Sequence, residues 1–177
     1  MILIGLGANL PSELGDPRET LGAALSMLAA QGVVIEARSR WYRTPPMGPQ
    51  PQPAFVNAAA RLGTQMGAEA LLALLHRTEA ALGRIRAERW GARAVDLDLL
   101  DYHGRIENQG GVSGLAAGNG PIPLSLPHPG IPERAFVLVP LLDIAPGWTH
   151  PVSGLSVAQM LEKLGNAADL GIESISD

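Results

Sequence analysis

Cysteine is absent from the 177 residues, so disulfide bonds and thiolate zinc sites are excluded. A chain of this length buries enough surface to fold without such cross-links, and one domain is expected over residues 1–177. No apolar run approaches the roughly 18 residues of a membrane span, and no basic segment precedes the apolar start as in a secretory signal peptide. Composition therefore predicts a cytoplasmic domain with no membrane partner.

Lysine is nearly absent, because Lys163 is the only one among 13 basic residues. A Walker-type phosphate loop needs a lysine inside a glycine-rich turn, and Lys163 lies in no such turn, so this class of site is excluded. The net charge is −4, which argues against a nucleic-acid partner. Aromatic residues make up only 4% of the chain, with two phenylalanines, Phe55 and Phe136.

The pattern of apolar residues and breakers predicts alternating strands and helices. Strands are expected over residues 1–6, 33–43, 54–62 and 95–102. A first helix is expected to start at Pro17, with Asp16 as its N-cap and Glu19 completing the capping box, and to end at Gly32. A second covers residues 68–83. The order strand, helix, strand, strand, helix, strand predicts a ferredoxin-like βαββαβ sandwich of the α+β class, with a mostly antiparallel sheet and helices on one face.

The C-terminal part of the chain adds further elements to this plan. A short helix is expected over residues 137–143, and a last helix starts after the capping residue Ser156 and ends near Gly165. Residues 107–126 contain a glycine-rich stretch that is expected to be an insert loop. Residues 166–177 carry no strong pattern and are expected to form a loosely ordered tail.

Two aspartates in the strand over 95–102 form the first candidate site. Because side chains alternate along a strand, Asp96 and Asp98 point the same way, while Leu97 points into the core. Two close carboxylates repel unless a cation lies between them, and Mg²⁺ prefers oxygen ligands of this kind. The alternative is an exposed strand face with two solvated acids.

Four arginines precede these aspartates within ten residues, namely Arg84, Arg86, Arg89 and Arg93. The planar guanidinium suits phosphate oxygens, so several in one loop beside a metal-binding pair predict a polyphosphate site. Trp90 adds a stacking surface. The alternative is a solvated basic loop whose arginines pair with surface acids.

Two further segments carry candidate binding residues. Five of the ten residues from Thr44 to Pro53 are prolines, so this segment is a stiff loop whose backbone, together with the Asn57 amide, can read the edge of a flat heterocycle. His128 lies between two prolines, and it and Arg134 are candidate phosphate or metal contacts. The rings of Phe55 and Phe136 could stack on the two faces of such a heterocycle. The alternatives are that His128 is an ordinary surface histidine and that both phenylalanines belong to the core.

Taken together, several motifs resemble the 6-hydroxymethyl-7,8-dihydropterin pyrophosphokinase family, over residues 1 to about 165. These motifs are Gly5-Leu6-Gly7-Ala8-Asn9, Tyr42-Arg43-Thr44-Pro45-Pro46, Phe55-Val56-Asn57-Ala58, Gly83-Arg84-x-Arg86, Arg89-Trp90-Gly91-x-Arg93-x-x-Asp96-Leu97-Asp98, and Pro127-His128-Pro129 followed by Arg134-x-Phe136. The resemblance implies a ferredoxin-like fold and transfer of pyrophosphate from ATP to the pterin hydroxymethyl oxygen in folate biosynthesis, releasing AMP. It also implies two Mg²⁺ ions and ATP as co-substrate. The chain is expected to be a monomer.

The resemblance assigns a role to individual residues. Asp96 and Asp98 are expected to bind both metals, and Arg84 and Arg93 to complete the catalytic set by stabilising charge on the phosphates. The expected ATP contacts are Glu79, Arg84, Arg86, Trp90, Arg93, Ser125, His128 and Arg134. The expected pterin contacts are Thr44, Pro45, Met47, Phe55, Asn57, Trp90, Asp96 and Phe136, with the two phenylalanines stacking on the two faces of the ring.

The chain departs from the family pattern in three places. Residues 107–126 are longer and richer in glycine, Pro123 and Ser125 stand where an arginine and a threonine are common, and Ala87 replaces a basic residue. Two other readings remain open, a two-metal phosphoesterase that needs no ATP and a non-catalytic ferredoxin-like module. A nucleic-acid-binding version of the module would carry exposed aromatics on a basic sheet, a pattern not apparent in the sequence.

Overall fold

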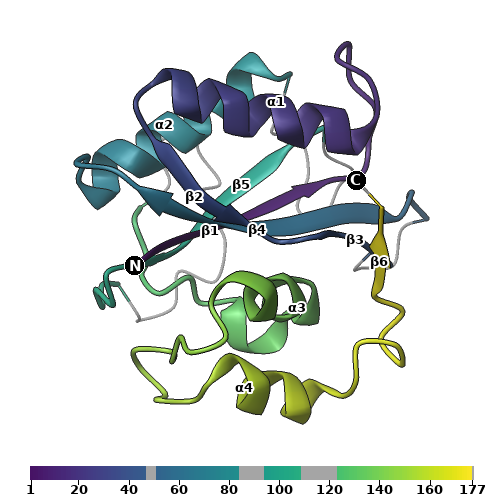
Figure 1. Ribbon diagram of the computed structural model, residues 1–177, viewed down its shortest axis with the longest axis vertical. Helices are drawn as coiled ribbons and strands as arrows, with labels where there is room; N and C mark the ends of the chain where they lie inside the picture. Colours follow the sequence, from purple (N-terminus) through teal and green to yellow (C-terminus); the bar gives the residue numbers. More distant parts are fainter. Residues whose placement is uncertain (47–50, 84–93, 109–122, 177) are drawn as a thin grey trace.

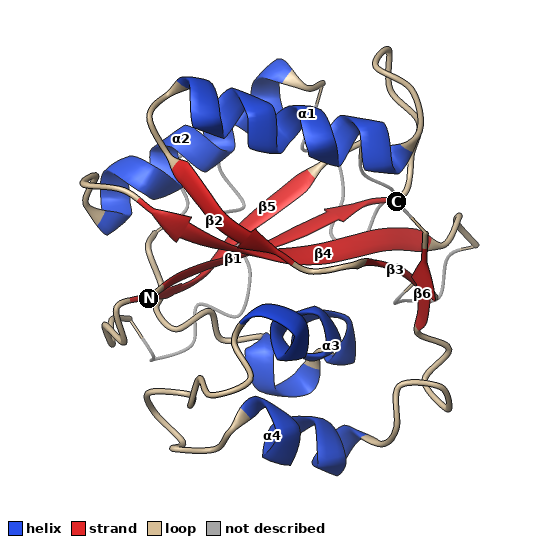
Figure 2. Cartoon of the chain, viewed as in Figure 1, coloured by secondary structure: helices blue, strands red, loops and turns tan. Residues whose placement is uncertain are grey.

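The computed structural model describes residues 1–46, 51–83, 94–108 and 123–176. It is a mixed α/β structure in which a sheet lies between two layers of helices (Figures 1 and 2). The strands are β1 (Ile2–Ala8), β2 (Val34–Arg38), β3 (Trp41–Thr44), β4 (Phe55–Gly63), β5 (Asp96–Tyr102) and β6 (Glu173–Ile175). The helices are α1 (Pro17–Ala30), α2 (Ala68–Ala81), α3 (Ala135–Ile144) and α4 (Val157–Leu164), with one 3₁₀ turn, η1 (Ile131–Glu133).

Strand order confirms the predicted ferredoxin-like arrangement. Within the described residues the sheet runs β5-β1-β4-β3-β6, with β2 also paired to β4, and every pairing is antiparallel. The expected helices α1 and α2 begin where the sequence predicted, and the capping box at Asp16 forms, with its carboxylate accepting from the Arg18 and Glu19 amides. The equivalent box at Ser156 opens α4.

Helices cover both faces of the sheet rather than one. The helices α1 and α2 lie on one face, as expected, whereas α3 packs on the opposite face and α4 lies on the outer side of α3 (Figure 1). Strand β1 is therefore buried on both sides: Ile2, Ile4 and Leu6 join the core under α1 and α2, and Leu3 joins the core under α3 and α4. This double burial explains why β1 is almost continuously apolar. No helix among the described residues is long and apolar enough to cross a membrane.

The predicted strand over residues 33–43 is divided into β2 and β3 at Ser39. The backbone amide of Ser39 donates to the Ala59 carbonyl, but its hydroxyl accepts from the Ala59 amide and donates to the Arg40 carbonyl. A side chain thus takes the place of a backbone acceptor, and the ladder is interrupted. The new strand β3 also pairs with β6, which no sequence pattern had indicated.

A bulge in β5 brings Asp101 to the side of the sheet that α3 and α4 cover. Leu99 lies opposite Ile4 but Asp101 lies opposite Leu3, so Leu100 is an extra residue on β5. The bulge turns Asp101 toward Leu3 and the α3 side of the sheet. Asp101 is 1% exposed, accepts from the Gly104 amide, and has its pKa raised by burial against hydrogen bonds from Gly104 and Trp148.

His150 is the titratable group next to this acid. It is 5% exposed, contacts the Trp148 ring edge-on, and its Nδ1 accepts the Ser153 amide. Burial lowers the pKa of His150 from 6.5, and the charge of Asp101 opposes that shift. The folded protein therefore keeps this ring neutral at a pH where the unfolded chain would protonate it.

We expect this histidine to make the protein less stable in mild acid. As the pH falls through 6.5, the unfolded chain takes up a proton that the folded chain resists, so the free energy of unfolding falls. Urea unfolding at pH 7 and pH 5 should show a smaller fall for His150→Asn, which keeps an acceptor near the position of Nδ1, than for the unaltered protein. Parallel pH profiles of the two proteins would contradict the assignment.

Candidate active site

The sheet face toward α3 changes character along β1. Where α3 covers it, the face carries Leu3, Ala59 and Leu100. Further along β1 the same face carries Gly5 and Gly7 in place of apolar side chains. Polar side chains of the neighbouring strands surround these glycines, and this end of the face is the candidate active site.

Strand register places the polar groups in rows across the sheet. Gly7 of β1 lies opposite Asp96 of β5 on one side and Asn57 of β4 on the other. Gly5 lies opposite Asp98 in the same way. Residues directly opposite in antiparallel strands project from the same face, so both aspartates and Asn57 share one surface, as predicted for the aspartates from strand alternation alone.

Any side chain at position 7 would push against Asn57. A Cβ atom there would lie 2.8 Å from Asn57 Oδ1, closer than real Cβ atoms approach. Because Gly7 has no side chain, the space between the carboxylate of Asp96 and the amide of Asn57 is not filled from β1. Gly7, the third residue of the first motif, thus has a packing reason, which composition and spacing did not reveal.

Asp98 faces an imidazole and a guanidinium at the edge of the sheet. His128 Nε2 lies 3.9 Å from Asp98 Oδ1, and Arg134 Nη1 lies 3.9 Å from Asp98 Oδ2. Both distances exceed hydrogen-bond length, so the three groups surround a space rather than closing it. The sequence separates Asp98 from the other two residues by 30 positions or more, and the fold brings them together.

Backbone contacts aim His128 and Arg134 at this space. The His128 amide donates to the Leu100 carbonyl at 2.8 Å, which attaches the segment to β5. His128 Nδ1 accepts the Gly130 amide at 3.0 Å, so Nε2 carries the proton in the neutral ring and points to Asp98. The Arg134 side chain crosses Gly130, where a Cβ would lie 2.6 Å from the guanidinium, and it stacks over Phe136 with Cζ 5.9 Å from the ring centre.

The expected heterocycle-reading residues lie along β3 and β4. Asn57 Nδ2 donates to Thr44 Oγ1 at 2.7 Å, and both side chains are buried. Phe55 is opposite Thr44 and two residues from Asn57, so it projects from the same face. Phe55 and Phe136 are each only partly buried, unlike core phenylalanines, and Pro45 directly follows β3 in an exposed position.

Asn9 is a site residue whose role the sequence did not reveal. It lies at the end of β1, is 2% exposed, and its Nδ2 donates to Gln52 Oε1 and to the Pro53 carbonyl, each at 3.0 Å. It ties the described end of the proline-rich loop to the strand that carries Gly7. An asparagine after a glycine pair was the available sequence feature, but its partners lie more than 40 positions away.

Two of the expected ATP contacts lie behind or beside this surface. Glu79 of α2 is 1% exposed, and its Oε1 accepts the Leu97 amide at 2.7 Å, so it holds the backbone between Asp96 and Asp98 from the opposite face of the sheet. Ser125 donates to the Asn108 carbonyl at 3.2 Å, next to the backbone bridge between Glu107 and Leu126. Five predicted site residues lie outside the described part of the chain: Met47, Arg84, Arg86, Trp90 and Arg93.

The donor set at this face fits a hard divalent cation that is completed by substrate oxygens. Two carboxylates share one face of β5 above glycines that leave room, and oxygen ligands of this type suit Mg²⁺. Within residues 1–46, 51–83, 94–108 and 123–176, no group of three or more His, Asp or Glu side chains could hold a metal by itself. Mg²⁺ commonly combines one or two carboxylates with phosphate oxygens and water, so a pair is sufficient.

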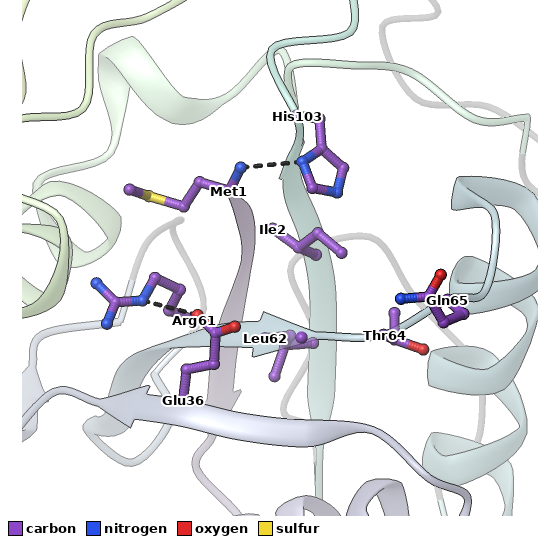
Figure 3. Close-up of a pocket in the computed structure, with 9 residues that line it drawn as sticks. Met1, Ile2, Glu36, Arg61, Leu62, Thr64, Gln65 and His103 are labelled. Atoms are coloured by element: carbon purple, nitrogen blue, oxygen red, sulfur yellow. Dashed lines mark hydrogen bonds and ion pairs between the residues drawn. The ribbon is translucent and has the colours of Figure 1, made fainter.

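A cavity of about 470 Å³ lies at the opposite end of β1, beside Met1 and Ile2. Figure 3 shows that its charged groups face one another, with Arg61 Nε 3.1 Å from Glu36 Oε2 and the Met1 amino group 3.1 Å from His103 Nδ1. None of the predicted site residues lines it. Because its charges are paired internally, this cavity is not the candidate active site.

Comparison with known proteins identifies the family. The family model described as 7,8-dihydro-6-hydroxymethylpterin-pyrophosphokinase (HPPK) matches residues 3–146. The 2-amino-4-hydroxy-6-hydroxymethyldihydropteridine pyrophosphokinase of Methylorubrum extorquens is 40% identical over 174 residues, which cover 97% of this chain and 96% of the relative. Folic acid synthesis protein fol1 of Pneumocystis carinii is 36% identical over 92% of this chain, which spans 20% of that longer protein.

A solved structure agrees at the level of the fold. The crystal structure of an HPPK-DHPS protein in complex with substrates superposes with a TM-score of 0.65 at 12% identity, over 92% of this chain and 44% of that chain. The similarity of the sequence motifs to one enzyme family is therefore confirmed by the family model and by the relatives. The chain belongs to the 7,8-dihydro-6-hydroxymethylpterin-pyrophosphokinase family.

Proposed function

We propose that this chain transfers a pyrophosphoryl group from ATP to 6-hydroxymethyl-7,8-dihydropterin in folate biosynthesis. The pterin hydroxymethyl oxygen forms a bond to the β-phosphorus of ATP, the bond between that phosphorus and the α,β-bridging oxygen breaks, and AMP leaves. The hydroxyl proton is released. The observation that carries the proposal is the face of β5, β1 and β4 that joins Asp96 and Asp98 to Asn57 across Gly7.

The described residues divide this face between two substrates. Thr44 and Asn57 offer a hydroxyl and an amide beside Gly7, and Phe55 projects from the same face, which suits a flat heterocycle with donors and acceptors on its edge. Phe136, in the first turn of α3, is proposed to stack on the other face of this ring. His128 and Arg134 present cationic or hydrogen-bonding groups beside Asp98, which suits the phosphates of ATP. The reacting hydroxyl and phosphate then meet near the aspartates.

The chemistry asks these residues for positioning and charge stabilisation more than for covalent work. Asp96 and Asp98 would hold Mg²⁺, for which we propose two ions. When bound, Mg²⁺ neutralises phosphate charge and lowers the pKa of the attacking hydroxyl. Arg134 stabilises negative charge on the phosphates, and Glu79 keeps the β5 backbone between the two aspartates in place. The roles that the family implies stay predictions for five residues: Arg84, Arg86, Trp90, Arg93 and Met47. The monomeric state, the cytoplasmic location and the absence of a nucleic-acid partner also stay predictions.

The direct test resolves the nucleotide product. The protein is incubated with Mg²⁺, ATP and 6-hydroxymethyl-7,8-dihydropterin, and AMP is separated from ADP. We expect AMP, formed only when the pterin is present and in equal amount to the pterin diphosphate. ADP, or inorganic phosphate released without the pterin, would refute the proposal and favour ordinary kinase or phosphoesterase chemistry.

Asp98→Asn should lower the turnover rate roughly 10²-fold or more. A neutral amide binds Mg²⁺ more weakly than a carboxylate does, so the negative charge on the phosphates is less well stabilised. The Mg²⁺ concentration needed for half-maximal rate should also rise. Steady-state kinetics across a Mg²⁺ series checks both quantities. Glu162→Gln removes an exposed acid of α4 and serves as the matched control. An unchanged Mg²⁺ requirement in Asp98→Asn would place the metal elsewhere.

Gly7→Ala should raise the KM for the pterin roughly tenfold or more and leave the KM for ATP nearly unchanged. The added Cβ would displace the Asn57 amide, and an error of about 1 Å in a binding group can cost on the order of 10²-fold. Gly22→Ala is the control, because a Cβ at that position of α1 meets no atom within 4 Å. Equal pterin KM values in the two variants would show that Gly7 does not shape the pterin site.

A further inference from the structure

Helix α3 carries Phe136 in its first turn and follows directly on Arg134, so its position along the sheet decides where both side chains lie. Nine of its ten residues are apolar, and four of them, Val137, Leu138, Leu141 and Ile144, are buried in the core that α3 and α4 share with the sheet. Apolar burial holds the helix against the sheet but is non-directional. The helix also has no side-chain hydrogen bond at its N-terminus. A directional contact elsewhere therefore adds a constraint on its register that apolar burial does not supply.

Asp143 in the last turn is the polar side chain of α3, and it makes this contact. Its Oδ2 accepts from the Tyr42 hydroxyl at 2.9 Å and from the Arg40 amide at 3.0 Å. Arg40 Nη2 donates to Oδ1 at 2.8 Å and Arg40 Nε donates to Oδ2 at 3.2 Å. Burial alone would raise the pKa of Asp143, but these hydrogen bonds hold it below its ordinary value, so the carboxylate is charged at neutral pH. The Arg61 guanidinium adds a tie to the neighbouring Ile144 carbonyl at 3.1 Å.

Tyr42 connects this cluster to the pterin-reading residues. It lies on β3 directly opposite Asn57 of β4, and two residues later Thr44 accepts the Asn57 amide. The Tyr42 ring is 4% exposed and packs with Val139 of α3. Burial, together with the hydrogen bond to Asp143, raises the pKa of Tyr42 to about 12, so its hydroxyl remains a donor.

The spacing on α3 completes the connection. Phe136, Val139 and Asp143 are at positions i, i+3 and i+7, which lie on one side of a helix. We infer that Tyr42 and Asp143, with Arg40, are positioning residues for the pterin site, because they set the register of α3, and with it Phe136, against the strands that carry Thr44 and Asn57. This inference rests on the proposed function.

The test separates the buried hydroxyl from the exposed arginine. Tyr42→Phe keeps the ring and removes the hydrogen bond to Asp143, and we expect it to raise the KM for the pterin three- to tenfold while the KM for ATP changes less than twofold. Asp143→Ala should act in the same direction and more strongly, and Asp143→Asn, which keeps an acceptor for Tyr42, should recover part of the loss. Arg40→Ala should have a smaller effect than Asp143→Ala, because it keeps the Arg40 amide and the Tyr42 hydroxyl on Asp143 and removes only a side chain that is 65% exposed.

Arg105→Ala is the matched control, since it removes another exposed arginine that pairs with a carboxylate, Glu69, at 2.7 Å. Pterin binding is also measured by fluorescence in the absence of ATP, and thermal unfolding shows that each variant is folded. An unchanged pterin KM in folded Tyr42→Phe overturns the inference, as does an equal rise of both KM values. If the unaltered protein forms no pterin-dependent AMP, the proposed function fails, whatever the variants do.

Discussion

Strand β1 lies between β4 and β5, and its register with both neighbours determines where the polar groups of the candidate active site lie. Gly7 faces Asp96 on one side and Asn57 on the other, and a shift of one residue would turn each side chain to the opposite face of the sheet. The register is set by burial on both faces of β1, because Ile4 and Leu6 must meet the α1–α2 core while Leu3 meets α3. The apolar core thereby brings two carboxylates and an amide from distant parts of the sequence onto one surface.

The division of one sheet face into covered and open parts follows from α3. The helix is apolar almost throughout and covers the end of the face that carries Leu3, Ala59 and Leu100. Its N-terminus delivers Arg134 and Phe136 to the boundary, and Asp143 ties its C-terminus to Arg40 and Tyr42. Beyond that boundary, glycines replace side chains on β1, and the polar surface stays accessible. The candidate site thus lies on the same sheet face as the packed core and beside it.

Much of the fold follows from local sequence patterns. Capping boxes at Asp16 and Ser156 mark helix starts, and alternating apolar residues mark β5, so the element order and the shared face of Asp96 and Asp98 were predicted correctly. The break at Ser39 and the strand β6 were not predicted, because each depends on a partner strand rather than on its own residues. The placement of α3 and α4 on the second face likewise depends on which side of the sheet remains uncovered.

The sequence by itself determined the types of chemistry available and the family. Closely spaced motifs such as Asp96-Leu97-Asp98 indicate a type of chemistry from a few neighbouring residues. The family model confirms the family that these motifs indicate. Only the tertiary structure decided which distant residues meet: His128 and Arg134 beside Asp98, Asn9 on Pro53, and Asp143 on Tyr42, a contact 101 positions apart. The physical reason is that such contacts depend on strand register and helix packing, which are set by burial of the whole core and not by any local segment.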